Sequence, residues 1–379
     1  MLKLKNGYLL HKIAGIPYLL PYGQNVADFR RSIRLNESGV LLYHALEQGA
    51  DEQTLLTALI SHYQAKNSDI PALKADISHF LLQLQAANIL SPSADTNAKA
   101  ADYYFQIGPI IIAYHGPEEL LAPSLQDFSC ECNAPNLTIH IVPSAPEVHV
   151  NGEVLVRTDE MTICSNEGSY LFLYPPGYGI SEMHVTKGRH AALFCPKPYD
   201  SGLPEKIFHA LRFSFLICAQ RKGIFALHSA SILYQNKAWL FSGPSGSGKS
   251  THTALWNRCY QTPYLNGDLN LLGFEADKPI VYGSPWCGTS GYYTTSAVPL
   301  GGITFLKQAP TDALLPINVQ EISLRTIQRL VSPSWTSNML LTNLSFVEKL
   351  STSVPFFHLQ CTKEDSAAAV IKQAIDTYI

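Results

Sequence analysis

The sequence predicts an α/β protein whose core surrounds a phosphate-binding loop, with a β-rich lobe and a small helical module toward the N-terminus. Three observations support this. The stretch GPSGSGKS, from Gly243 to Ser250, matches the phosphate-loop pattern. Short β-rich runs alternate with Gly, Pro and Asn turns between residues 103 and 197. Apolar residues recur at helical spacing between residues 36 and 89.

The order of these segments divides the chain. Its 379 residues suffice for two or three domains. The polar stretch SPSADTNAKAA, residues 91–101, has no apolar period and predicts a linker. We therefore expect a winged-helix-like domain over residues 1–92, a β-rich lobe over 93–202 and the phosphate-loop domain over 203–379. Within the lobe, Asn151-Gly152 between alternating valines predicts a hairpin.

Composition narrows the class of partner. The net charge is -3, 15% of residues are charged, and basic residues form no block, so neither nucleic acid nor a membrane surface is expected as a partner. No run of eighteen apolar residues occurs, and Asn6 and Gly7 interrupt the N-terminal stretch, so a span or secretion signal does not fit. We expect a cytoplasmic protein that binds small molecules or specific proteins.

The cysteines and histidines predict no metal site. Eight cysteines are spread along the chain, which is typical of free thiols in a reducing compartment. Cys130 and Cys132 form the only close pair, and no second pair follows at a zinc-ligand spacing. The histidines of the lobe also lack ligand spacing, and we interpret them as ordinary surface or core residues: His140, His149, His184 and His190.

The phosphate loop carries the chemistry. Its glycines let successive backbone N–H groups face an anion, and the helix that follows adds its positive N-terminal end. Lys249 is predicted to reach the outer phosphates, and the Ser250 hydroxyl to hold Mg²⁺. The predicted nucleotide-binding residues are Gly243, Pro244, Ser245, Gly246, Ser247, Gly248, Lys249, Ser250 and Thr251.

The flanks of the loop agree with the motif. KAWLF, residues 237–241, reads as a buried strand, and residues 251–259 continue as a helix. A second strand is expected from Tyr264, ending in Asn266-Gly267-Asp268. A carboxylate at a strand end near the loop is where phosphate-loop enzymes hold Mg²⁺, so Asp268 is the second predicted metal ligand.

The first ninety residues combine a hairpin, broken by Gly15 and Pro17, with three short helices. The series LNESGVLLYHAL and DISHFLLQLQAANIL resembles the PqqD-like domain. The resemblance implies that this domain docks the leader of a ribosomally made precursor peptide, by pairing it with the hairpin edge. A module that only packs on the core is the alternative. DNA binding is disfavoured because the third helix offers only Lys74 and His79 as positive side chains.

The segment from Ile207 onward resembles the HPr kinase family, which shares a core with ATP-dependent phosphoenolpyruvate carboxykinases. The stretches that carry the likeness are LHSASI, GPSGSGKST, LNGDLNLL, GSPWCGTSGYYTTSAVPLGGITFLKQ and VPFFHLQCTKEDSAAAVIKQAI. The resemblance implies a catalytic domain that transfers a phosphoryl group from a nucleotide, usually ATP, to a hydroxyl, with Mg²⁺ as cofactor. It also implies possible self-association, since HPr kinases are commonly hexameric.

The chain departs from that family at one catalytic position. The family's two adjacent aspartates match Gly267 and Asp268, so a single carboxylate remains. Either Asp268 serves both the metal and the substrate proton, or His228, which matches a histidine near the phosphates, is the base. A weakly catalytic scaffold is a further alternative.

Positive charge for the transition state has few candidates, namely Lys307, Arg325 and Arg329. The two arginines lie four residues apart on a helix expected from Glu321 to Val331, where they share a face. The segment SPWCGTSGYYTT, residues 284–295, reads as a flexible loop with hinges at Gly288 and Gly291. Many relatives have a lysine near Thr289, which this chain lacks.

Together these features predict an ATP-dependent kinase for a serine or threonine hydroxyl of a precursor peptide. Two alternatives stay open: a kinase for a small metabolite, and a nucleotide-binding scaffold that presents a peptide to partner enzymes. The sequence does not distinguish ATP from GTP, and it does not identify the acceptor.

Overall fold

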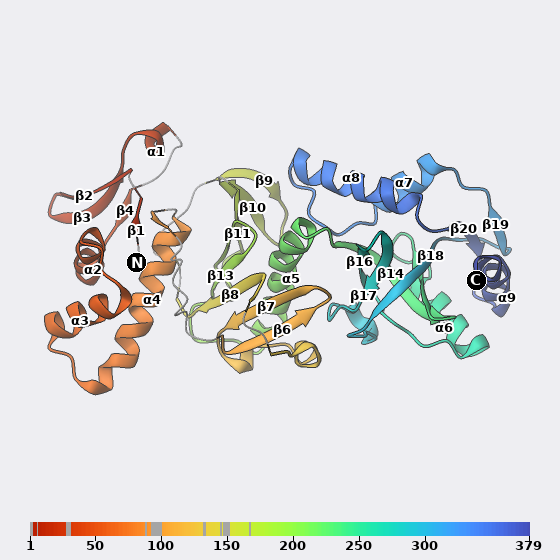
Figure 1. Cartoon of the computed structure of the whole chain (residues 1–379), viewed down its shortest axis with the longest axis horizontal. Coiled ribbons are helices and arrows are strands. Elements are labelled where there is room, and N and C mark those ends of the chain that lie inside the picture. Colours follow the sequence, from red (N-terminus) through yellow and green to blue (C-terminus); the bar gives the residue numbers. More distant parts are fainter. Residues whose placement is uncertain are drawn as a thin grey trace. The chain divides into compact units, whose positions relative to one another are not determined.

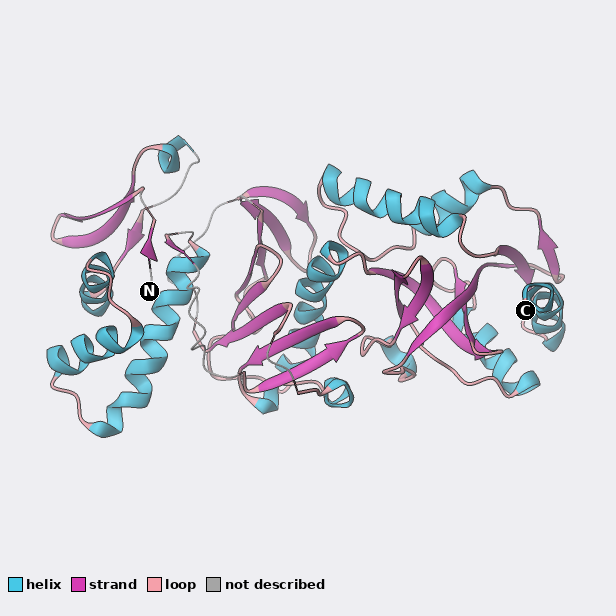
Figure 2. Ribbon diagram, in the orientation of Figure 1, coloured by secondary structure: helices cyan, strands magenta, loops and turns pink. Residues whose placement is uncertain are grey.

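The computed structural model describes the chain except for residues 1, 2, 6, 28–31, 88, 92–100, 132–133, 145, 147–151 and 167. The protein is mixed α/β, with large sheets and long helices (Figures 1 and 2). Its contacts form two compact units. Unit 1 comprises Met1–Asp102, His115–Glu118 and Ile139–Lys206, and unit 2 comprises Tyr103–Tyr114, Glu119–Thr138 and Ile207–Ile379. The three-domain division stays a prediction.

The N-terminal part of unit 1 contains a small antiparallel sheet and three longer helices. Its strands pair in the order β2-β3-β4, which leaves β2 at an edge. Side chains of Asn36 and Asp51 cap α2 and α3 by accepting backbone N–H groups, which explains where these helices begin. The elements are β1 (Lys3–Leu4), β2 (Tyr8–Ile13), β3 (Ile16–Pro21), α1 (Gln24–Ala27), β4 (Ile33–Arg34), α2 (Glu37–Glu47), α3 (Glu52–Tyr63), η1 (Asn67–Asp69), α4 (Ile70–Ala86) and β5 (Leu90–Ser91).

The rest of unit 1 is a β-rich lobe. Its strands follow the order β8-β13-β12-β11-β10-β9, and the pairs from β9 to β13 are antiparallel. Buried residues such as Phe172, Met183 and Leu193 form its apolar interior. The strands are β8 (Leu137–Val142), β9 (Glu153–Arg157), β10 (Thr162–Asn166), β11 (Ser169–Leu173), β12 (Glu182–Thr186) and β13 (His190–Phe194). The hairpin residue Asn151, the centre of the expected linker and Cys132 lie outside the described residues.

Unit 2 is built on a seven-stranded mixed sheet in the order β15-β14-β16-β17-β18-β20-β19. A further pairing of β15 with β18 closes five of these strands into a ring. A tight turn joins β14 to β15, with positive φ at both Gln235 and Asn236. The strands of this sheet are β14 (Phe225–Tyr234), β15 (Lys237–Ser242), β16 (Leu269–Glu275), β17 (Lys278–Tyr282), β18 (Ala297–Gln308), β19 (Ala313–Leu315) and β20 (Phe356–Cys361). Strands β6 (Tyr103–Ile107) and β7 (Ile110–His115) pair with each other antiparallel and are not part of it.

Two apolar clusters hold three helices of unit 2, α6, α8 and α9, to this sheet. One joins Phe225 and Ile303 to Phe346 of α8, and the other joins Trp239 and Phe241 to Trp256 of α6 and to α9. The helices are η2 (Glu118–Leu120), η3 (Pro123–Phe128), α5 (Leu203–Arg221), α6 (Lys249–Tyr260), η4 (Gly288–Ser290), α7 (Val319–Ile327), α8 (Ser337–Ser351), α9 (Asp365–Ile375) and η5 (Asp376–Tyr378). Among the described residues, no helix has both the length and the apolar character needed to cross a membrane.

The direction of the strands decides where a ligand can sit. Strands β15, β18 and β20 run parallel to one another, so their carboxyl ends meet at one edge of the sheet. The phosphate loop follows β15 at that edge. Ligands of α/β sheets bind outside the carboxyl ends of parallel strands, where loops and helix N-termini converge.

Two expectations from the sequence are wrong here. The strand expected to end at Asp268 does not form: Tyr264 makes an isolated bridge, and β16 begins after Asp268 and runs antiparallel to β14. The helix expected to carry both arginines ends at Ile327, so Arg325 lies in α7 and Arg329 lies beyond it. The two arginines therefore do not share a helix face.

Candidate functional site

The phosphate loop joins β15 to α6 with a backbone that few side-chain-bearing residues adopt. Gly246 and Gly248 have φ of 76° and 95°, in the region that glycine alone enters without strain. Helix α6 begins at Lys249 without a side-chain cap from any residue that the structure describes. Its first N–H groups are therefore free to bind an anion, as the motif predicts.

Lys249 curls over this loop. Its Nζ donates to the carbonyl oxygens of Gly243 and Pro244, at 3.4 Å each. Burial lowers the pKa of Lys249; Asp268 opposes this shift, and Arg329 adds to it. Lys249 therefore lies within electrostatic reach of one carboxylate, Asp268, and of a second positive charge, Arg329.

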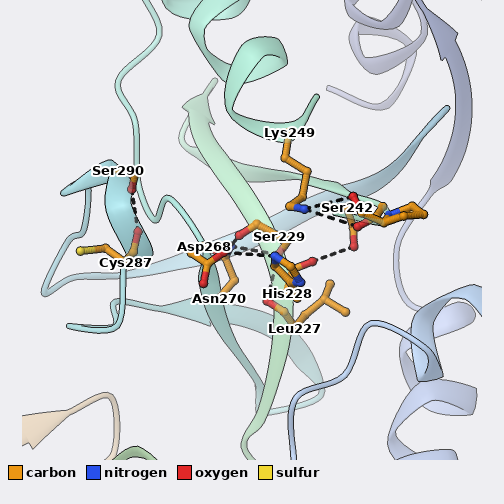
Figure 3. Close-up of polar contacts among 11 residues, drawn as sticks. Leu227, His228, Ser229, Ser242, Lys249, Asp268, Asn270, Cys287 and Ser290 are labelled. Atoms are coloured by element: carbon orange, nitrogen blue, oxygen red, sulfur yellow. Dashed lines mark hydrogen bonds and ion pairs between the residues drawn. The ribbon is translucent and has the colours of Figure 1, made fainter. Parts of the chain in front are cut away.

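The acid is held by a histidine on the neighbouring strand. Nε2 of His228, in β14, lies 3.1 Å from Oδ1 of Asp268, and the two side chains are about one third and two fifths exposed. Figure 3 shows this pair beside Lys249. The hydrogen bond from His228 is the main reason why the pKa of Asp268 falls below its usual range, while burial opposes the fall. Asp268 is therefore an anion at neutral pH.

His228 is itself fixed by the backbone on both sides. Its N–H donates to the carbonyl oxygen of Arg329 at 2.9 Å. Its carbonyl oxygen accepts the Ser242 hydroxyl at 2.9 Å, from the last residue before the phosphate loop. The histidine thus links the loop strand to the segment that follows α7.

A buried polar network supports the turn that carries Asp268. Asn270 donates to the carbonyl and hydroxyl oxygens of Ser229, at 2.6 and 2.9 Å. Its Oδ1 accepts hydrogen bonds from Ser231 at 2.7 Å and from Asn266 at 3.1 Å. All four residues are at most 1% exposed. Buried polar groups with satisfied partners fix one geometry, because any displacement leaves a group unpaired.

The segment 284–295 packs against the same turn. The N–H of Gly267 donates to the carbonyl oxygen of Tyr292 at 2.9 Å. A Cβ at Gly267 would lie 1.7 Å from Oγ of Ser290, whose hydroxyl donates to the Cys287 carbonyl at 2.7 Å. A Cβ at Gly288 would lie 3.0 Å from Cβ of Asp268. The space beside the Cα of Gly267 is therefore filled by the Ser290 side chain of this segment.

Two arginines add positive charge to the site. Arg329 disfavours the protonated form of Lys249 and so lowers its pKa. Arg212, in α5, lowers the pKa of Asp268 together with His228 and Lys249. Of these two, only Arg329 is predicted from the sequence. Arg212 is missed because it lies in a mostly apolar helix far from the motif in the sequence.

The other two predicted cations lie in different surroundings. Arg325 pairs with Glu321 at 3.6 Å, one turn earlier in α7, and sits 5.9 Å from the Phe305 ring centroid. Lys307 is exposed near the end of β18. The charges that shift the pKa values of Lys249 and Asp268 include neither residue, within the part of the chain that the structure describes.

The oxygen donors of the site decide whether a magnesium ion fits there. No group of three or more His, Cys, Asp or Glu residues with metal-site geometry occurs among the described residues. Mg²⁺ in phosphate-loop sites needs few protein ligands, because the substrate phosphates and water complete its coordination. The Asp268 carboxylate, anionic beside the loop, and the Ser250 hydroxyl in the first turn of α6 are oxygen donors of the type that Mg²⁺ prefers.

Comparison with known proteins adds little to this geometry. No protein-family model matches the chain, and no curated protein matches it. Among solved structures, it is similar to the HPr(Ser) kinase/phosphatase from Coxiella burnetii, at 11% identity and a TM-score of 0.24. The match covers 40% of this chain and 93% of that structure.

Proposed function

We propose that the chain is an ATP-dependent kinase that transfers the γ-phosphoryl group to a serine or threonine hydroxyl of a ribosomally made precursor peptide. The observation that carries the proposal is the convergence of Lys249 with the His228–Asp268 pair at the phosphate loop. Lys249 there supplies a positive charge for the transferred phosphoryl group, and Asp268 supplies a carboxylate that can contact the acceptor hydroxyl. Loose phosphoryl transfer depends mainly on such positioning and charge stabilisation.

The residues of the loop divide the binding task. Backbone N–H groups around Gly246 and Gly248 cradle the phosphates, and Lys249 turns from the loop carbonyls to the outer phosphate oxygens. Ser250 and Asp268 are the residues that would hold Mg²⁺ at this site. When bound, this ion neutralises charge on the group in transfer. Arg329 adds a second positive charge within electrostatic reach of Lys249.

Asp268 also receives the proton of the acceptor. The hydroxyl oxygen forms a bond to the γ-phosphorus, the bond to the β-phosphate oxygen breaks, and the hydroxyl proton passes to the carboxylate. ADP leaves. The low pKa of Asp268 makes it a weak base, which suffices because little negative charge builds on the attacking oxygen in a loose transition state. His228 acts as a positioning residue that orients this carboxylate.

The peptide-docking part of the proposal rests on the edge strand of the N-terminal sheet. Strand β2 is paired on one side with β3, and its Leu9 and Ile13 side chains are 58% and 51% exposed. An edge strand offers backbone hydrogen bonds to an added strand, and exposed apolar side chains offer alternate contacts. A leader peptide fits this surface by pairing with β2.

A mass-spectrometric assay tests both parts of this function. The protein is incubated with ATP, Mg²⁺ and a library of serine- and threonine-containing peptides, together with any short peptide encoded beside its gene. We expect a phosphate-sized mass gain that Lys249→Ala and Asp268→Asn each reduce at least a hundredfold, as loss of transition-state charge or proton transfer does. His228→Gln, which keeps a donor to Asp268, retains more activity than His228→Leu.

The docking surface has a matched control. Leu9→Glu places a charge on the β2 edge and is expected to raise KM for the peptide while kcat is unchanged. Leu341→Glu places the same charge on α8, where the side chain is 59% exposed, and leaves both values unchanged. Equal effects of the two variants contradict leader docking on β2 and leave the kinase assignment intact.

One observation favours a second function, a nucleotide-binding scaffold that turns over weakly. Ser290 occupies the space beside Gly267, so a second carboxylate has no room there. Tight ATP binding with no phosphorylated peptide and no ADP formation decides for the scaffold. ADP formation that increases with a metabolite mixture instead of peptides decides for a metabolite kinase.

A further inference from the structure

A cavity of about 300 Å³ lies beside the phosphate loop in unit 2. Its walls come from the chain that follows three parallel strands: Gly248 and Thr251 after β15, Gln308 and Ala309 at the end of β18, and the turn from Cys361 after β20. It therefore occupies the edge of the sheet where ligands of α/β proteins bind. Its volume is at the lower end of those that hold small molecules.

Two buried polar atoms without partners belong to residues that line this cavity. Nδ1 of His252 and Oγ of Ser247 make no hydrogen bond to any residue that the structure describes. The two residues are only 2% and 8% exposed. Buried polar groups are nearly always paired, and each one left unsatisfied costs about 1–3 kcal/mol. A ligand in the cavity would supply the missing partners.

The hydrogen bond that His252 makes through Nε2 decides whether its unpaired Nδ1 is a donor or an acceptor. The Trp256 indole N–H donates to Nε2 of His252 at 3.3 Å, so Nε2 is an acceptor. An imidazole nitrogen that accepts a hydrogen bond carries no proton, so the ring proton of His252 is on Nδ1. His252 therefore presents one N–H donor.

The far wall of the cavity is held in place by an acid outside it. Asp312 accepts the backbone N–H of Thr362 at 2.6 Å and the Thr362 hydroxyl at 3.2 Å, and it also accepts the Ser366 hydroxyl. On the loop side, the Gln308 amide donates to the Gly246 carbonyl at 2.7 Å. Both sides of the cavity are thus tied to elements of the sheet, which makes it a preformed site.

We propose that this cavity is the nucleoside subsite of the protein, and that His252 donates its Nδ1–H to an acceptor atom of the bound nucleoside. The proposal rests on the proposed function, because a nucleotide must first place its phosphates in the loop. The phosphates then lie at the N-terminus of α6, and the nucleoside extends past Thr251 into the cavity. Ala309 and Cys361 contribute small side chains to the wall, which suits a flat base.

Two substitutions of His252 distinguish the role of its Nδ1–H donor from that of its Nε2 acceptor. Glutamine at this position places its amide oxygen near Nε2, keeping an acceptor for Trp256 but losing the Nδ1–H donor. Asparagine places an amide N–H near Nδ1, keeping the donor but losing the acceptor. His252→Gln and His252→Asn are therefore a matched pair, in which only the first lacks the proposed contact.

Titration calorimetry in the presence of Mg²⁺, with ATP and with inorganic tripolyphosphate as probes, tests the proposal. We expect the protein to bind ATP more tightly than tripolyphosphate. His252→Gln should weaken ATP binding about tenfold, the effect of one lost hydrogen bond that leaves an acceptor unpaired, and leave tripolyphosphate binding within twofold. His252→Asn should bind ATP nearly as the unsubstituted protein does. Lys249→Ala should weaken both ligands.

The two probes also distinguish the ways in which the proposal can fail. Equal affinity for ATP and tripolyphosphate overturns the nucleoside subsite while the phosphate site stands. An equal loss of both ligands in His252→Gln, or no loss of either, overturns the role of His252. Binding of neither probe to the unsubstituted protein overturns the proposed function itself. Retained tripolyphosphate binding shows in each His252 variant that the loop is folded.

Discussion

At the scale of single residues, the site depends on side chains whose surroundings decide their charge. Asp268 is anionic because His228 donates to it, and Lys249 is partly desolvated by the loop that it covers. Neither effect follows from residue type, since an aspartate after a glycine is also ordinary turn chemistry. Asp268 is the lone carboxylate of this turn. Packing leaves no room for a second one, because Ser290 fills the space beside Gly267.

The packing at Gly267 gives a testable prediction. Gly267→Ala puts a Cβ 1.7 Å from Oγ and 2.6 Å from Cβ of Ser290. We expect a loss of about 1–3 kcal/mol in the free energy of unfolding, typical of overpacking. Adding Ser290→Ala relieves part of this loss, and adding Ser290→Gly relieves most of it. Urea denaturation of the single and double variants measures the coupling. An equal loss in all three Ser290 backgrounds contradicts the assigned contact.

At the scale of elements, the pairing of β7 with β8 brings together two histidines that lie apart in the sequence. His115 of β7 and His140 of β8 stack at 4.3 Å between ring centroids, with their planes 4° apart. Burial lowers the pKa of His140 to about 3, and the charges of His115 and His190 add to the shift, against Asp102. The ring is thus neutral in the folded protein at any pH above that value.

This stack predicts a loss of stability in acid. The unfolded chain protonates His140 near pH 6.5, whereas the folded chain does so near pH 3. Stability is unaffected above pH 6.5 and falls as the pH drops through this window, because the unfolded state binds the extra proton. Between pH 7 and pH 5 the loss is at most about 2 kcal/mol.

The matched variant is His140→Phe, which keeps an aromatic ring against His115 but cannot bind a proton. Its free energy of unfolding should fall less than that of the unsubstituted protein between pH 7 and pH 5, by up to that amount. Urea denaturation at the two pH values gives both numbers. Parallel pH profiles for the two proteins would show that His140 titrates alike in the folded and unfolded chain.

At the scale of the whole molecule, the chain consists of two compact units, and the phosphate loop belongs to unit 2 alone. A ligand that binds only the folded state stabilises the unit that holds its site. Saturating ATP and Mg²⁺, at roughly 100 times the dissociation constant, should stabilise unit 2 by about 2.7 kcal/mol. The midpoint temperature of the thermal unfolding of unit 2 should therefore rise by several degrees.

Hydrogen exchange with and without the nucleotide localises this effect. We expect added protection in the phosphate loop, in α6 and in the turn after β20, with no change in the N-terminal strands and helices of unit 1. Lys249→Ala should abolish the protection. Protection that extends evenly over both units would show that they unfold together.

Local sequence determined much of this protein. The phosphate loop forms between a strand and a helix as its motif predicts, and helices form at residues 37–47, 52–63 and 70–86, within the stretch where apolar residues recur at helical spacing. Each of these signals acts within a few residues, so a single stretch contains the whole cause. The mixed α/β class follows from the same signals.

The tertiary structure decided those features of the site that depend on contacts between residues far apart in the sequence. Asp268 lies before a strand instead of after one, because β16 pairs with β14, forty residues earlier in the chain. Arg212 of α5 and Ser290 of the 284–295 segment act on the turn that carries Asp268, although both lie outside the phosphate-loop motif in the sequence. No local pattern marks these residues, since strand order and direction bring them together. The sequence alone therefore names the phosphate loop, and the pairing of the strands assembles the pocket around it.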